Sequence, residues 1–155
     1  MTDVDLDRFR ATRTEHDRAL DEIRGGRKSS HWMWYVFPQA TGLGSSEMSR
    51  RFAIAGVEEA GAYLEDPGLR SDYIEMVDGV WDQVVDGDVT VHDLFGSPDD
   101  GKLVSSLTLF AGVARTRTPG LNRLVAQADA ILEAATVQGL EPCQVTMALL
   151  RASDR

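Results

Sequence analysis

Hydrophobic residues recur at intervals of three and four along most of the chain, which is the spacing of amphipathic helices. In the first segment charged residues fill most of the positions between them. Gly25-Gly26 then ends the pattern, because glycine favours the left-handed conformation that closes helices. The sequence predicts a helix up to this glycine pair. Its inward stripe comprises Leu6, Phe9, Thr12, His16, Leu20 and Ile23.

Glycine, proline and capping residues divide the rest of the chain into further helices. Ser46 is a good N-cap, and Thr90-Val91-His92-Asp93 has the pattern of a capping box on a one-turn helix. The strongest start signal is Ser97-Pro98-Asp99-Asp100, where serine can cap, proline suits the first helical position and two acids favour the positive end of the helix dipole. Further helices are expected at about residues 46–55, 57–65, 69–84, 91–95, 97–114, 118–138 and 142–150.

About seven helices emerge from this pattern when the one-turn helix at 91–95 is set aside, with no alternating strand and no βαβ rhythm. No repeat, low-complexity segment or linker divides the chain. We therefore expect an all-α fold, a single compact multihelical domain over residues 1–155. Periodicity leaves residues 32–37 unassigned, because a short apolar run fits a buried strand or a buried helix equally well.

Composition and charge limit the classes of function. The 155 residues include 16 Lys and Arg against 25 Asp and Glu, a net charge of −9, and 43% of them are hydrophobic. These values indicate a soluble globular protein and argue against a general nucleic-acid binder, which needs clustered positive charge. No apolar run approaches the roughly 20 residues that span a bilayer, and the acidic start lacks the basic region of a signal peptide. A cytoplasmic protein without a membrane partner is expected. Cys143 is the single cysteine, so an internal disulfide is excluded.

The aromatic block at residues 32–37 is the first candidate for chemistry. Trp32 and Trp34 could form a stacking wall for a flat ring, and Gln39 follows the block. His31, placed after a polar turn, could act as an acid or a base near neutral pH. The alternative is that the block forms the centre of the core and that His31 has a hydrogen-bonded structural role.

A glycine-serine loop is the second candidate. Gly44 and Ser45 precede a predicted helix, and Arg51 follows inside it. Exposed backbone N–H groups with a nearby guanidinium group can bind an anion or a phosphate. The alternative is an ordinary capped helix with solvated arginines.

The helix predicted from residue 97 is the third candidate. Asp99 and Lys102 are three residues apart, so the two charged groups can pair and tune each other, as acid–base sites require. Ser105 and Ser106 follow near the same face and either let another helix approach closely or line a polar cavity. The alternative is a capped helix with one surface ion pair of little energetic weight.

Metal and cofactor chemistry has little support. His16, His31 and His92 are scattered and lack the HxxxH or HExxH spacing of zinc sites, and no nucleophile elbow is present. We expect no metal site and no cofactor. The remaining alternative is a metal held by Asp99, Asp100 and a distant histidine.

Residues 26–39 (GRKSSHWMWYVFPQ) and 42–46 (GLGSS) resemble a small bacterial family catalogued as domain of unknown function 1810, whose members often carry the automatic label calpastatin. The resemblance spans about residues 5–115, and the helical part at 116–155 is less diagnostic. It implies a compact multihelical domain and no established activity. True calpastatins are long disordered inhibitors, unlike this patterned chain. Phe52 and Gly101 depart from the tyrosine and leucine that the family commonly has there.

These observations predict a polar, aromatic-walled pocket for a small anionic or nucleotide-like ligand, with hydrolysis as a candidate reaction. The alternative is a non-catalytic protein-interaction module in which the aromatic block is core. The oligomeric state is left open. The candidate catalytic residues are His31, Asp99 and Lys102. The candidate ligand-binding residues are Trp32, Trp34, Gln39, Gly44, Ser45, Arg51, Ser105 and Ser106.

Overall fold

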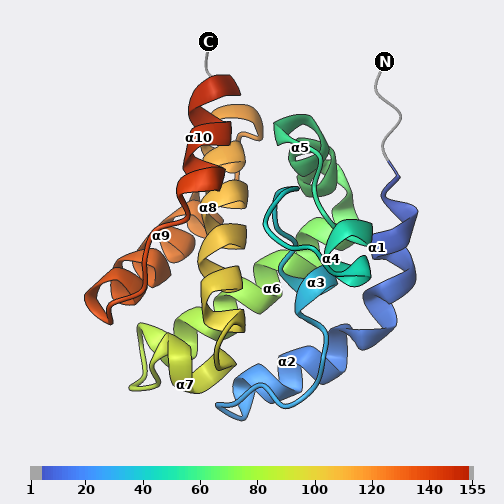
Figure 1. Cartoon of the computed structure of the whole chain (residues 1–155). Helices are drawn as coiled ribbons and strands as arrows, with labels where there is room; N and C mark the ends of the chain where they lie inside the picture. The colour runs from blue at the N-terminus through green and yellow to red at the C-terminus, as the bar shows by residue number, and fades with distance from the viewer. Residues whose placement is uncertain (1–4, 154–155) are drawn as a thin grey trace.

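The computed structural model describes residues 5–153, and helices dominate it (Figure 1). Residues 1–4, which carry most of the argument about a signal peptide, lie outside the described part. The helices are α1 (Asp7–Ala11), η1 (Thr12–Glu15), α2 (His16–Arg24), α3 (Met33–Val36), α4 (Glu47–Arg51), α5 (Val57–Glu65), α6 (Pro67–Val84), α7 (Val91–Phe95), α8 (Asp99–Arg117), α9 (Asn122–Val137) and α10 (Gln144–Ser153).

The predicted all-α class is confirmed for residues 5–153, but the expected count of about seven helices is too low. The first predicted helix is split into α1, the 3₁₀ helix η1 and α2. The Thr12 hydroxyl donates to the Phe9 carbonyl (2.8 Å), and such bonds back onto the preceding turn bend helices. The aromatic run also adds a helix, because Met33–Val36 forms the single turn α3.

The predicted capping residues are confirmed more often than the predicted first residues of the helices. Thr90 Oγ1 accepts from Asp93 N and Ser46 Oγ accepts from Ser49 N, each at 3.0 Å, as their sequence patterns predict. Helix α8 begins at Asp99, two residues after the expected start. Pro98 occupies the N-cap position, and no side chain caps the helix. The helix expected from Thr118 likewise begins only at α9, because Thr118–Leu121 forms a turn through Gly120, whose φ is +93°.

The core lies where two long helices cross (Figure 1). Helix α6 packs against α1, α2, α5 and α9, whereas α8 packs against α5, α7, α9 and α10. At the crossing Tyr73 of α6 meets Phe110 of α8, with ring centroids 4.6 Å apart. The Tyr73 and Ser106 hydroxyls are 2.9 Å apart and both residues are buried. The two helices thus join the halves of the chain in one core.

A glycine lets α2 approach α6 closely. A Cβ at Gly79 would lie 3.3 Å from both Ile23 Cγ2 and Leu20 Cδ1, which is tighter than ordinary van der Waals contact. The absence of a side chain at this position therefore sets the distance between the two helices. None of the described helices has the length and apolar character that a membrane crossing requires.

Candidate functional site

A cluster of three charged side chains joins the loop after α2 to the start of α8. Lys28 Nζ lies 2.8 Å from Asp99 Oδ2, and Lys102 Nζ lies 3.5 Å from Asp99 Oδ1. Only 7% of the Lys28 side chain is exposed. The chain contains only two lysines, and both contact this one carboxylate. We call Lys28, Asp99 and Lys102 the lysine–aspartate cluster.

The two halves of the cluster are positioned in different ways. Asp99 and Lys102 pair because they are three residues apart on α8, as the sequence predicts. Lys28 reaches Asp99 from the α2–α3 loop, where its N–H donates to the Leu94 carbonyl (2.7 Å) and its ammonium donates to the Ser30 carbonyl (2.6 Å). The loop therefore attaches to both α7 and α8.

Glu22 at the end of α2 fixes the conformation of this loop. Its Oε1 accepts from Ser29 N (2.7 Å), Ser30 N (2.9 Å) and Trp32 Nε1 (2.9 Å). Burial by itself would raise the pKa of Glu22, but the hydrogen bonds from Ser30, Ser29 and Trp32 outweigh it and lower the pKa to about 2. The carboxylate is thus held ionised beneath the loop that presents Lys28.

The two tryptophans of the expected wall have different surroundings. Trp32 is 1% exposed, and its ring contacts Phe95 edge-on with centroids 6.4 Å apart. It is a core residue, as the alternative interpretation held for the block. Trp34 is only partly buried, and the Lys102 ammonium lies 5.7 Å from its ring centroid. Of the two rings, Trp34 is the one that is accessible to solvent.

A surface depression of about 540 Å³ adjoins the cluster. One side is formed by Gly26, Arg27 and Lys28 of the α2–α3 loop, and the other by residues 92–96 of α7 and its C-terminal glycine. Arg27 is exposed, so a guanidinium group and an ammonium group border the same hollow. Sequence reasoning missed Arg27, Lys28 and His92. The arginine and the lysine lie five and four residues before the aromatic block, and this proximity was the signal available.

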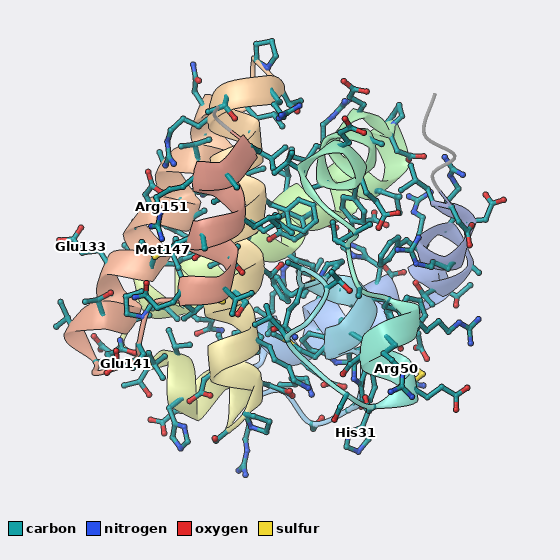
Figure 2. The ribbon with its side chains drawn as sticks, turned by 45° about the horizontal axis from the view of Figure 1, so that its top comes forward. His31, Arg50, Glu133, Glu141, Met147 and Arg151 are labelled. Atoms are coloured by element: carbon teal, nitrogen blue, oxygen red, sulfur yellow. The ribbon has the colours of Figure 1, made fainter. Side chains whose placement is uncertain are left out.

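His31 does not join the cluster through its described contacts. Its side chain is exposed at the outer surface (Figure 2), and its backbone carbonyl accepts from the Tyr35 hydroxyl at 3.5 Å. Although His31 is close to Lys28 in the sequence, its imidazole has no described contact with Asp99. Its assignment as an acid or base stays a prediction.

The glycine-serine loop lies at a different part of the molecule. The Arg51 guanidinium stacks 5.3 Å from the Phe52 ring centroid, and the Arg51 carbonyl accepts from Arg8 Nε at 2.9 Å. These contacts place α4 beside α1, whereas α8 begins beside α7 (Figure 1). Gly44 and Ser45 are exposed just before α4. The structure does not bring these residues to the lysine–aspartate cluster.

The remaining candidates serve packing in this structure. Ser105 donates to the Gly101 carbonyl (3.3 Å), and Ser106 pairs with Tyr73, so both hydroxyls are used inside the protein. The Gln39 carbonyl accepts from Ile54 N (2.8 Å), next to the isolated parallel bridge between Ala40 and Ile54. Their assignment to ligand binding has no support from these contacts and stays a prediction.

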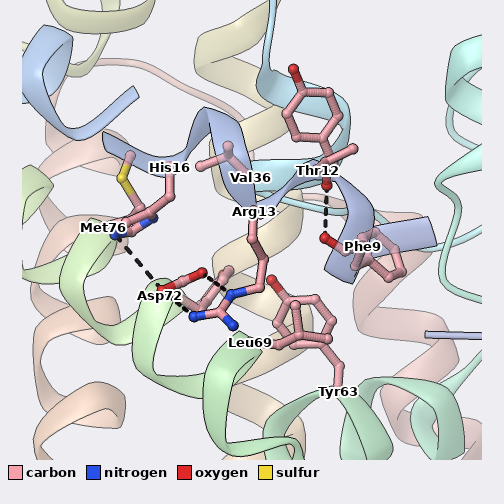
Figure 3. A pocket seen from close by; sticks show the side chains of 11 residues that line it. Phe9, Thr12, Arg13, His16, Val36, Tyr63, Leu69, Asp72 and Met76 are labelled. Carbon is pink, nitrogen blue, oxygen red and sulfur yellow. Dashed lines mark hydrogen bonds and ion pairs between the residues drawn. The ribbon is translucent and has the colours of Figure 1, made fainter. Parts of the chain in front are cut away.

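A second cavity lies between η1, α2 and α6 (Figure 3). Its volume is about 30 Å³, which holds a water molecule or two but not an organic ligand. Arg13 Nε lies 2.7 Å from Asp72 Oδ2, and His16 Nε2 lies 2.6 Å from Glu75 Oε1, so charged pairs from facing helices line its rim. These pairs connect η1 and α2 to α6 rather than form a binding site. Across residues 5–153, no group of three or more His, Cys, Asp or Glu side chains could hold a metal ion.

Comparison with known proteins identifies the family. The profile of DUF1810, described as a protein of unknown function, matches residues 3–140. The crystal structure of the conserved hypothetical protein Rv1873 from Mycobacterium tuberculosis is similar, with 38% sequence identity and a TM-score of 0.80 over 95% of this chain and 96% of that chain. No curated protein matches the chain. The chain therefore belongs to the DUF1810 family, whose function is unknown.

Proposed function

We propose that the protein binds a small anionic or nucleotide-like ligand at the depression beside the lysine–aspartate cluster. The observation that carries the proposal is the convergence of Lys28 and Lys102 on a single carboxylate. Two ammonium groups and one carboxylate leave one positive charge in excess, and Arg27 adds another at the rim. Asp93 of α7 also lines the depression, so the positive potential that an anion meets there is confined to the side formed by Arg27 and Lys28.

This local charge stands out against the rest of the molecule. The chain carries a net charge of −9, so most of its surface repels anions. Lys28 is also preorganised, because Asp99 and the Ser30 carbonyl use two of the three donors of its ammonium group. A ligand that contacts an already ordered cation loses less side-chain entropy on binding.

Trp34 supports the nucleotide-like part of the proposal. Its partly exposed ring lies beside Lys102, and neither residue lines the depression itself. A ligand that extends beyond the depression could place an anionic group on the Lys102 ammonium and a flat ring on the indole. Trp32 is enclosed and its N–H is used by Glu22, so it supports the site from behind. Both oxygens of Asp99 face lysines, which suits holding the cations in place. We accordingly propose binding, and treat hydrolysis as a second readout of the same experiment.

The first experiment titrates pyrophosphate, ADP and ADP-ribose into the protein, with binding followed by calorimetry and product formation followed by chromatography. We expect Lys102→Met to weaken binding at least about tenfold, which corresponds to roughly 1.4 kcal/mol. Arg123→Met is the matched control, because Arg123 is an exposed cation on α9 paired with Asp78 at 2.8 Å. This control should bind as the wild type does.

Lys28 needs a paired variant, because its removal alone takes away the closer of the two cations beside Asp99 and destabilises the fold. The double variant Lys28→Met with Asp99→Asn removes both charges and should fold yet lose affinity. Unchanged affinity in this double variant and in Lys102→Met would contradict the proposal.

The competing function is a protein-interaction module in which the aromatic block is core. The burial of Trp32 agrees with the core role of that residue. Such a module predicts no response to any small anion and no change in Trp34 fluorescence. Complete absence of binding across the titration would favour this candidate.

A further inference from the structure

A histidine–aspartate pair borders the same depression from α7 and α8. His92 Nδ1 lies 3.0 Å from Asp100 Oδ2, and the Gly101 N–H donates to Asp100 Oδ1 at 2.8 Å. The Asp100 side chain is 9% exposed, whereas that of His92 is 63% exposed. A nearly buried carboxylate thus orients an imidazole whose other face is open to solvent.

The position of His92 is fixed by its short helix. Thr90 caps α7 at one end, and the Gly96 N–H donates to the His92 carbonyl (2.7 Å) at the other. His92 lines the depression that Arg27 and Lys28 border, and also a smaller neighbouring hollow formed with Gln138–Leu140. The charged groups that share these two hollows with it are Asp93, Asp100, Arg27 and Lys28.

The hydrogen bond to Asp100 determines which nitrogen of the ring is available. An ionised carboxylate only accepts, so the neutral imidazole carries its hydrogen on Nδ1 and leaves the lone pair on Nε2. A carboxylate at Nδ1 also stabilises the imidazolium that forms when Nε2 takes a proton. Protonation of Nε2 therefore changes the net charge of the pair from −1 to 0, beside a hollow that is lined by Arg27, Lys28 and the Asp93 carboxylate.

We propose that His92, oriented by Asp100, is a proton-coupled ligand of this anion site. When a tetrahedral dianion binds between Arg27, Lys28 and His92, Nε2 takes up a proton from solvent and donates it as a hydrogen bond to the anion. This inference rests on the proposed function and adds to it a dependence on pH. Anion affinity increases as pH falls through the range in which imidazoles gain their charge.

Sulfate is the suitable probe, because it remains a dianion throughout the pH range in which histidine titrates. Calorimetry at constant ionic strength, at pH 6 and pH 8 and in two buffers of different ionisation enthalpy, measures both the affinity and the number of protons taken up. For the wild type we expect tighter binding at pH 6, by up to about tenfold per pH unit, with net proton uptake on binding. His92→Gln should bind more weakly and equally at both pH values.

Two further variants separate a specific role from a general effect of charge. Asp100→Asn should move the proton uptake to lower pH, so that it decreases at pH 8, because the substitution removes the carboxylate that stabilises the imidazolium. His16→Gln removes an imidazole that pairs with Glu75 in the other cavity, and should retain the wild-type dependence on pH. Long-range ¹H–¹⁵N spectra without sulfate should show His92 as the Nδ1–H tautomer.

The outcomes distinguish this inference from the proposed function. Sulfate binding that depends on Lys102 but not on pH would overturn the role of His92 and leave the anion site standing. A dependence on pH that persists in His92→Gln, or an Nε2–H tautomer in the free protein, would overturn it as well. If sulfate, pyrophosphate and ADP all fail to bind, the anion site itself is wrong, and the role of His92 is wrong with it.

Discussion

At the scale of single residues, Glu22 has the clearest electrostatic role. Three donors converge on one carboxylate oxygen, and its pKa of about 2 lies below the ordinary value of 4.5. A carboxyl whose pKa is lower in the folded state contributes stability that is present above the unfolded value and is lost as pH falls through the folded one. The contribution of Glu22 should therefore disappear between about pH 4.5 and pH 2.

The variant Glu22→Gln tests this residue. The amide oxygen can still accept the three hydrogen bonds, but these bonds no longer involve a charged acceptor. We therefore expect the free energy of unfolding, measured by urea denaturation at pH 7, to decrease by roughly 1–2 kcal/mol. The difference from the wild type should shrink at pH 3. Glu133→Gln on the exposed side of α9 is the control and should change little at either pH. A difference that stays constant from pH 7 to pH 3 would contradict this account.

At the scale of the helices, two glycines with similar neighbours in sequence have opposite roles. A Cβ at Gly79 of α6 would lie 3.3 Å from Ile23 and Leu20 of α2, so these side chains would have to shift, whereas Gly101 in α8 faces open space. Alanine is favoured over glycine in a helix by up to about 1 kcal/mol. We expect Gly101→Ala to gain roughly that amount in free energy of unfolding. The free energy of unfolding of Gly79→Ala should be at least about 1 kcal/mol lower than that of Gly101→Ala. Both side chains that the new methyl group would contact are buried, which restricts their movement. Equal effects of the two substitutions would mean that α2 is not held against α6 at this distance.

At the scale of the whole molecule, the crossing of α6 and α8 links elements from both halves of the chain. Tyr73→Phe leaves the Ser106 hydroxyl buried without its partner, at a cost of roughly 1–2 kcal/mol. The double variant with Ser106→Ala should lose less than the sum of the two single variants, because they share one bond. Tyr35→Phe removes only an exposed 3.5 Å contact and should lie within about 0.5 kcal/mol of the wild type.

Circular dichroism and tryptophan fluorescence should report a single transition in every variant. Separate transitions would show that the two halves unfold independently.

The sequence by itself determined the features that depend on neighbours within about one helical turn. Periodicity predicted the all-α class, the caps at Ser46 and Thr90 were correct, and the pairing of Asp99 with Lys102 follows from their spacing. Each of these is a local interaction, so the residues that make it lie within the same short segment.

Only the tertiary structure decided which distant segments meet. Lys28 and Asp99 are far apart in sequence and come together because Glu22 folds the α2–α3 loop onto α7 and α8. Trp32 and Trp34 look alike in the sequence, yet one is enclosed and the other partly exposed, since an apolar run has no period that assigns its faces. His31 was favoured over His92 because of its neighbours in the chain, but contact with a buried carboxylate depends on packing between helices. The hydrophobic pattern along the chain determines the helices. The packing of these helices around one core determines which residues come together at the candidate site.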